Sequence, residues 1–268
     1  HITLKAATDV LLGSGSATGV DVQTSTAGTI SIDAEAGALT MAGTANVTAT
    51  NSSARLNAAT SVTLGNVTAA NVSVVSDTGA IINAAGSTKN VTATNLRLQA
   101  DDAMGDAARH LSTNVDTLTA VSTGTTTAGI YLTEDNAVTV DTVTVSVSDF
   151  SATATTGVVT DGNQSDLVAG NNGNIVLVLG GTITLNDGAN SAGVSVSANG
   201  SGSILLDVNS GNLVVNSDII SGTGHITLKA ATDVLLGSGS ATGVDVTTAT
   251  AGTISIDAEA GALTMAGD

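Results

Sequence analysis

Residues 1–43 read HITLKAATDVLLGSGSATGVDVQTSTAGTISIDAEAGALTMAG, and residues 225–267 repeat this stretch with two changes. The other 41 of the 43 positions are identical at an offset of 224 residues, which indicates a recent duplication. We therefore expect residues 1–224 to form one large tandem unit and residues 225–268 to start the next, near-identical unit. Because neither end has the atypical sequence of a capping repeat, we expect the parent protein to be much longer.

A shorter motif recurs inside this unit, and its apolar residues alternate with polar ones. In the segment GSILLDVNSGNLVVNS, Ile204, Leu206 and Val208 occupy every second position. A period of two is typical of a β-strand with one apolar face, and the Asn-Ser-Gly break that follows is typical of a turn. Each motif thus predicts a strand, a short turn and a second strand. Motifs of this form begin at residues 1, 28, 129, 173, 202 and 225.

The spacing of these motifs predicts a right-handed parallel β-helix, an all-β solenoid with stacked coils of about 20–30 residues. Ile204 and Ile226 are 22 residues apart, and Ile226 and Ile254 are 28 residues apart. A β-propeller also repeats at such intervals, but the aromatic and Trp-Asp signatures of its blades are missing. Parallel crossover connections are nearly always right-handed, which sets the expected sense of winding.

The amino-acid composition suits a thin aliphatic core. The 268 residues include no Pro, Cys or Trp, one Tyr and one Phe, while 42% are hydrophobic. Small and β-branched side chains must therefore fill an interior that is one layer deep and repeated along an axis. The formal net charge is −17, and six scattered Lys and Arg residues cannot supply the clustered positive charge that nucleic acid requires. No stretch approaches the ~18 consecutive apolar residues of a membrane span.

The segment Ala100–Val115 (ADDAMGDAARHLSTNV) interrupts the alternating pattern. Its Asp pair could begin a short helix, whereas Gly105 in its middle disfavours one. We expect a loop or an irregular turn that bulges from one coil, with Leu111 returning to the core. Loops that protrude from a regular scaffold commonly carry recognition. The candidate binding residues are therefore Asp101, Asp102, Asp106, Arg109 and His110.

The residue inventory predicts no enzyme, no cofactor site and no metal centre. A catalytic site needs a nucleophile or an acid–base group beside an orienting partner, and the three His residues are isolated in the sequence. The neighbours Glu134 and Asp135 should point to opposite faces of a strand, so they do not make a catalytic pair. Loosely held Ca²⁺ at solvent-exposed corners is the one ion that the carboxylates suggest. The corner carboxylates are Asp9, Asp21, Asp33, Asp161, Asp166, Asp187 and Asp207.

Two longer stretches carry a family resemblance. They are NLVVNSDIISGTGHITLKAATDVLL (Asn212 to Leu236) and LRLQADDAMGDAARHLSTNVDTLTAVSTGTTTAGIYLTEDNAVTV (Leu96 to Val140). In the second, a Gly-containing break precedes a Leu-x-Thr-x-Val-x-x-Leu-x-Ala strand that starts at Leu111, and Gly129 opens the next strand. These stretches resemble the filamentous haemagglutinin family of giant bacterial surface exoproteins. The resemblance implies right-handed β-helical rods that are secreted and act as adhesins or fibres at the bacterial cell surface.

The repeat and the resemblance together predict a structural protein. We expect a segment of an extracellular fibre or adhesin stalk, whose edge strands pair with neighbouring repeats of the same chain or with further copies to give filaments. The alternative is an adhesive module that binds a cell-surface glycan or a receptor through the loop near residues 100–115. Deletion of that loop would separate the two hypotheses, since a structural rod should still assemble without it.

Overall fold

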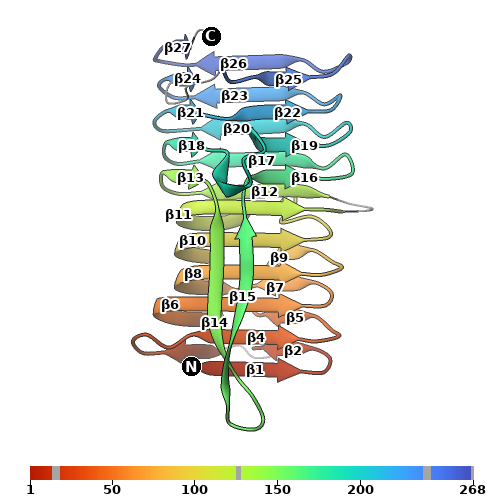
Figure 1. The fold of residues 1–268 in the computed structure, drawn as a ribbon, viewed down its shortest axis with the longest axis vertical. Helices are drawn as coiled ribbons and strands as arrows, with labels where there is room; N and C mark the ends of the chain where they lie inside the picture. Colours follow the sequence, from red (N-terminus) through yellow and green to blue (C-terminus); the bar gives the residue numbers. More distant parts are fainter. Residues whose placement is uncertain (14–18, 125–127, 238–242, 267–268) are drawn as a thin grey trace.

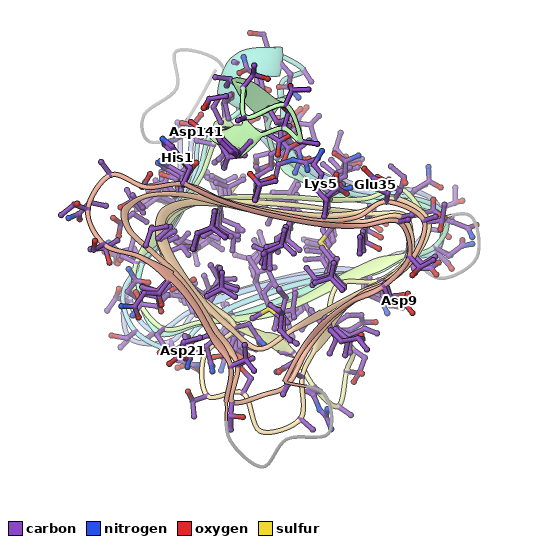
Figure 2. All side chains as sticks on the ribbon, turned by 90° about the horizontal axis from the view of Figure 1, so that it is seen from below. His1, Lys5, Asp9, Asp21, Glu35 and Asp141 are labelled. Carbon is purple, nitrogen blue, oxygen red and sulfur yellow. The ribbon has the colours of Figure 1, made fainter. Side chains whose placement is uncertain are left out.

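The computed structural model describes residues 1–13, 19–124, 128–237 and 243–266. In these residues the chain winds into a parallel β-solenoid, with the N-terminal coil at one end of the stack and the C-terminal coil at the other (Figure 1). The near strands run from left to right while the coils rise, so the winding is right-handed (Figure 1). Seen along the axis, the coils superimpose as a triangle with side chains inside (Figure 2). The structure thus confirms the predicted fold class.

One ladder of ten parallel strands runs the length of the stack. Its register stacks like residues on like, as in Ile2 against Ile30 and Leu96 against Leu118. The ladder gives the rod one continuous face. Its members, in spatial order, are β1 (Ile2–Ala6), β4 (Ile30–Ala34), β6 (Asn46–Ala58), β8 (Asn66–Ser76), β10 (Val91–Ala100), β11 (Leu111–Ser122), β16 (Leu167–Ala169), β19 (Val194–Ala198), β22 (Asp218–Ser221) and β25 (Val246–Thr248).

Shorter ladders complete the other faces of the stack. In the first half they consist of β2 (Val10–Leu12), β5 (Leu39–Met41), β7 (Val62–Leu64) and β9 (Ile81–Asn83), and β3 (Asp21–Thr24) pairs with the first part of β6. In the second half one ladder consists of β12 (Gly129–Glu134), β17 (Asn174–Leu179), β20 (Ile204–Val208), β23 (Ile226–Ala230) and β26 (Ile254–Ala258). Another consists of β13 (Val138–Val140), β18 (Ile183–Leu185), β21 (Leu213–Val215), β24 (Val234–Leu236) and β27 (Leu263–Met265).

The core is a set of aliphatic columns parallel to the axis. Ile175, Ile204 and Ile226 stack in register, and each is at most 1% exposed. Successive strands lie about 4.8 Å apart, so every inward side chain contacts an equivalent one in the next coil. Among the described residues the helical content is one 3₁₀ turn, at Gly188–Asn190. The short motifs of the sequence fold as strand, turn and strand, but their two strands lie on successive faces rather than in a hairpin.

A glycine column forms one corner of the second half of the stack. A Cβ atom at Gly224 would lie 2.0 Å from the carbonyl oxygen of Gly202, and one at Gly202 would lie 2.1 Å from that of Gly173. Gly252 has the same relation to Gly224, at 2.3 Å. These contacts are with backbone of the preceding coil, which a side-chain rotation cannot relieve. Glycine is therefore required here for close stacking of the coils.

The two copies of the 43-residue repeat adopt the same local structure. The His1 ring bonds to the Thr29 hydroxyl at 2.9 Å, and His225 bonds to Thr253 at the same distance. β1 pairs with β4 in the register that β23 keeps with β26. The copies nevertheless lie on different faces, because β1 belongs to the ten-strand ladder and β23 belongs to the ladder of β12. Residues 14–18 of the first copy and residues 238–242 and 267 of the second copy lie outside the described residues.

This change of face arises between β11 and β12. Leu118 is the first apolar residue of its motif and stacks on Leu96 in the ten-strand ladder. Ile130 is the first apolar residue of the next motif and stacks on Ile175 in the ladder of β12. Only 12 residues separate Leu118 from Ile130, fewer than one full coil. The next motif therefore begins before the chain has returned to its starting face. One 224-residue unit thus both advances along the axis and turns around it.

Candidate functional site

An antiparallel hairpin lies outside the solenoid and was not expected from the sequence. β14 (Val143–Phe150) pairs with β15 (Thr156–Gln164), and the pair runs along the axis over β11, β10, β8, β6, β4 and β1 (Figure 1). Figure 2 shows it outside the triangle, on the side that carries His1 and Lys5. We call this hairpin the strap. The 45 residues between Ile130 and Ile175, twice the usual coil, were the available signal.

The strap covers the outer surface of the ten-strand ladder with alternate residues of β14. Val143, Val145 and Val147 are at most 3% exposed, while the intervening Thr144 and Ser146 face solvent. Beneath the strap, the outward residues of the ladder are polar, and the hairpin buries several of them completely. These outward residues are Thr3, Ser31, Arg55, Ser73, Arg97 and Thr119. The strap is thus held by polar contacts as well as by valine burial.

Two arginines anchor the middle of the strap. Arg55 Nε lies 3.0 Å from both carboxylate oxygens of Asp161, and both side chains are largely buried. Arg97 is 8% exposed and donates from Nε to the carbonyl of Gly162 and from Nη2 to Gln99. Burial lowers the pKa of Arg97, and the negative charge of Asp161 opposes this shift. Asp161 therefore compensates two buried positive charges.

The end of the strap is bonded to the first coil. The amides of Ser148 and Phe150 donate to the hydroxyls of Thr29 and Thr3, each at 2.9 Å. Lys5 Nζ lies 3.2 Å from Asp149 Oδ2. The turn that follows, residues 151–155, projects past β1 beyond the end of the stack (Figure 1). We call these residues the tip.

The base of the strap carries a buried carboxylate, Asp166. Asn190 Nδ2 donates to Asp166 Oδ2 at 2.6 Å, while Asp166 Oδ1 has no partner and the residue is 4% exposed. Burial raises the pKa of Asp166 to about 6, and the negative charges of Asp187 and Asp141 add to the rise. Within the part of the chain that the structure describes, no group of three or more His, Cys, Asp or Glu side chains is arranged to hold a metal ion.

Substitution of this carboxylate should stabilise the protein at neutral pH. The folded pKa of Asp166, about 6, lies above the ordinary value of 3.8, so the stabilisation from its protonated form is complete below about pH 4 and is lost as the pH rises through 6. Asp166→Asn keeps an acceptor for Asn190 and suits the positive φ of 70° at this position. We expect the variant to gain about 1–3 kcal/mol at pH 8 and little at pH 4, measured by urea unfolding.

Asp77→Asn provides the control for this prediction, because Asp77 is exposed at a turn. It should leave the pH dependence of unfolding as it is in the parent chain. If Asp166→Asn gave the same gain at both pH values, the assignment of the titration to Asp166 would be wrong.

The predicted binding segment forms an irregular coil, in which residues 106–109 make an exposed turn. The amides of Asp101 and Asp102 donate to the carbonyls of Ser76 and Gly79 in the coil below. Met104 is fully buried and bridges Ile81 and Ile130 in the neighbouring coils. Asp101 and Asp102 therefore occupy one corner of the coil, before Met104, and the remaining candidates follow after it.

The second corner brings together Asp106, Arg109 and His110. Asp106 Oδ1 accepts the amides of Ala108 and Arg109, each at 2.8 Å, and so closes a small turn. Arg109 Nη1 donates to the carbonyl of Asn83. His110 Nδ1 bonds to Thr133 Oγ1 at 3.1 Å, and its ring lies 6.0 Å from that of Tyr131. The structure thus uses these side chains to close the corner, and it separates them from Asp101 and Asp102.

The adjacent carboxylates Glu134 and Asp135 point in different directions, as expected for strand neighbours. Glu134 is 1% exposed, accepts the amides of Val115 and Asn136, and has a pKa raised by burial. Asp135 lies on the outside, where Lys89 Nζ contacts it at 2.5 Å. Glu134 thereby accepts hydrogen bonds from the amides of Val115 and Asn136 where β12 pairs with β11. This is a structural role, and the two carboxylates do not face each other.

A shallow groove of about 320 Å³ runs across the bends of β6, β8 and β10. It forms where each of these long strands passes from one face to the next, and Asn51 has a positive φ of 54° at the first bend. Its lining side chains are small and mixed, with threonines and asparagines beside alanines. The lining residues are Thr50, Asn51, Thr68, Ala69, Ala70, Thr92, Ala93, Thr94 and Asn114.

No protein-family model, curated protein or solved structure matches this chain. Among the described residues, no helix is long and apolar enough to cross a membrane.

Proposed function

We propose that the chain is a segment of an extracellular structural rod, a fibre or an adhesin stalk of a very long bacterial surface protein. The observation that supports this proposal most strongly is the second copy of the repeat. Its first strand, β23, stacks on β20 in full register, from Ile226 on Ile204 to Ala230 on Val208. The start of a new unit therefore extends the same solenoid without a break, which is what a rod of tandem units requires.

End-to-end contact between units is part of the same proposal. Ile254, Leu263 and Met265 belong to β26 and β27 and are 44%, 48% and 66% exposed. In every interior coil the corresponding inward residues are buried by the next coil. A further unit, or a second copy of the chain, would cover these residues and continue the strand ladders. The resemblance to filamentous haemagglutinins supports a bacterial surface location, which stays part of the proposal.

Electron microscopy of the purified chain tests the filament hypothesis. Open edge strands at both ends should give thin, unbranched filaments whose width is that of one solenoid, with an axial repeat near ~4.8 Å. Asp substitutions at Ile254 and Leu263 should shorten the filaments by placing charges in the contact. Separate particles at all protein concentrations, in the parent chain as well as in the variant, would refute end-to-end assembly.

The groove favours glycan binding as a second candidate function. Its threonine and asparagine side chains offer hydrogen-bond donors and acceptors between alanines, although the aromatic platforms typical of sugar sites are absent from its lining. A glycan array would test it, with Thr68→Val and Thr92→Val together as the variant. Binding that is retained in this variant would place the glycan contact outside the groove. Binding that is retained in a variant that lacks residues 105–109 alone would place the contact outside that turn.

A further inference from the structure

We propose that the strap is an inter-unit clasp: the tip of each unit's strap binds the outer surface of β20 and β17 of the preceding unit. This inference rests on the tandem array of the proposed function, and it identifies the contact that locks one unit to the next. The partner is therefore a second copy of the strap, carried by the unit that begins at His225.

The two repeat copies carry equivalent contact residues for the strap. The strap is bonded to Thr3, Lys5 and Thr29 of the first copy. The same side chains recur in the second copy as Thr227, Lys229 and Thr253. β23 and β26 hold them in the register of β1 and β4. The strap of the second unit would therefore lie along the ladder of β23 and β26, on a different face from the first strap.

The tip lies beyond the strand to which the strap is bonded, because it projects past β1 (Figure 1). Below β23 the chain supplies β20 and then β17. Thr227, the equivalent of Thr3, pairs with Leu205, and Leu205 pairs with Val176. The tip of the second strap would thus lie over Leu205 and Val176.

The outer surface at that place differs from the surface beneath the first strap. The column beneath the first strap is polar, from Thr119 to Thr3. Its continuation in the preceding unit consists of Leu205, Val176 and Tyr131, which point outward and are only partly buried. Apolar side chains on the outside of a solenoid are stabilised when another element covers them. The tip, SATAT, has small residues that can lie flat over such a column.

The lysine that holds the first strap recurs at the same site. Lys5 pairs with Asp149 of the strap, whereas the equivalent Lys229 pairs with Glu259 at 2.6 Å and lies 3.7 Å from Asp207. A second strap would bring its own copy of Asp149 to Lys229. Asp207 stands directly below Lys229 in the ladder, so this lysine links the clasp to the preceding unit.

Disulfide trapping in a two-unit chain tests the clasp. The chain has no cysteine, so introduced pairs can be read without background. Residues 1–267 followed by residues 44–268 give two complete units across the natural junction at His225. Leu205→Cys in the first unit and Ser151→Cys in the second unit should form an intramolecular disulfide in most molecules under mild oxidation, because Ser151 follows the inward-facing Asp149 by two residues.

The matched control places both substitutions in the first unit. There the two cysteines lie at opposite ends of one unit, and we expect no intramolecular disulfide. Equal crosslinking in both arrangements, or none in the first, would overturn the clasp. Small-angle X-ray scattering of the same two-unit chain separates failure of the clasp from failure of the proposed function. A straight rod that forms no disulfide would refute the clasp alone. A bent or compact particle would refute the rod.

Discussion

Gly224→Ala should destabilise the protein by about 3 kcal/mol, a large effect for the addition of one methyl group. The new Cβ atom would lie 2.0 Å from the carbonyl oxygen and 2.4 Å from the carbonyl carbon of Gly202. Both atoms belong to the backbone of the coil below, so the two coils must separate. Separation would lengthen the hydrogen bonds of the adjoining ladder between β20 and β23. Urea unfolding followed by circular dichroism measures the loss.

Gly157→Ala is the matched control for this substitution. Gly157 lies in β15, and a Cβ atom there would meet nothing within 4 Å. We expect its free energy of unfolding to stay within about 0.5 kcal/mol of the parent value. A similar, small loss in both variants would mean that the coils are not stacked as closely at the Gly224 corner as the structure requires.

Asp161→Ala should destabilise the protein by about 3 kcal/mol and release the strap. The substitution leaves Arg55 without its partner at 3.0 Å and removes the negative charge that faces Arg97. Buried charges that lose their partner cost more than the pair itself contributes. We therefore expect rapid proteolysis in the tip, residues 151–155, while the solenoid stays folded in dilute urea. Limited proteolysis with mass spectrometry locates the cut.

Two further variants show whether charge burial is the cause. Asp149→Ala removes the more exposed pair with Lys5 and should cost no more than about 1 kcal/mol. Arg55→Leu combined with Asp161→Leu removes both buried charges and should recover much of the stability that Asp161→Ala loses. A double variant as unstable as Asp161→Ala would contradict this explanation.

The regular coils could be predicted from the sequence because one physical constraint repeats in each. The alternation of Ile204, Leu206 and Val208 sets the inward face, and the Asn-Ser-Gly break after them sets the corner. Parallel stacking then follows, because only a neighbouring coil can bury that face. The thin aliphatic core follows from the same residues, since a solenoid interior has no space that requires an aromatic ring.

The strap could not be predicted in the same way. Val143, Val145 and Val147 alternate like any inward-facing strand, and the pattern does not say whether the buried face meets the core or the outside of another sheet. The polar residues that receive it are distant in the sequence: Arg97 is 65 residues from Gly162, and Arg55 is 106 residues from Asp161. The structural role of the candidate binding segment could not be predicted either. Asp106 and Arg109 form hydrogen bonds with neighbouring backbone groups, and residue type alone does not distinguish this role from ligand binding.

The change of face between β11 and β12 was also hidden in the sequence. The copies at residues 1–43 and 225–267 are nearly identical, which suggests equivalent positions on the rod. Their actual placement depends on how many residues the intervening corners use. Corner lengths vary from coil to coil, and only the full path of the chain reveals their sum.

Small-angle X-ray scattering of the present chain and of the two-unit chain tests whether tandem units form one continuous solenoid. The ten-strand ladder has nine spacings, or roughly 43 Å at ~4.8 Å each. For a continuous solenoid, we expect the second unit to leave the cross-sectional radius unchanged and to add a similar length to the rod. A larger cross-section with little gain in length, or two bodies joined by a flexible link, would contradict it.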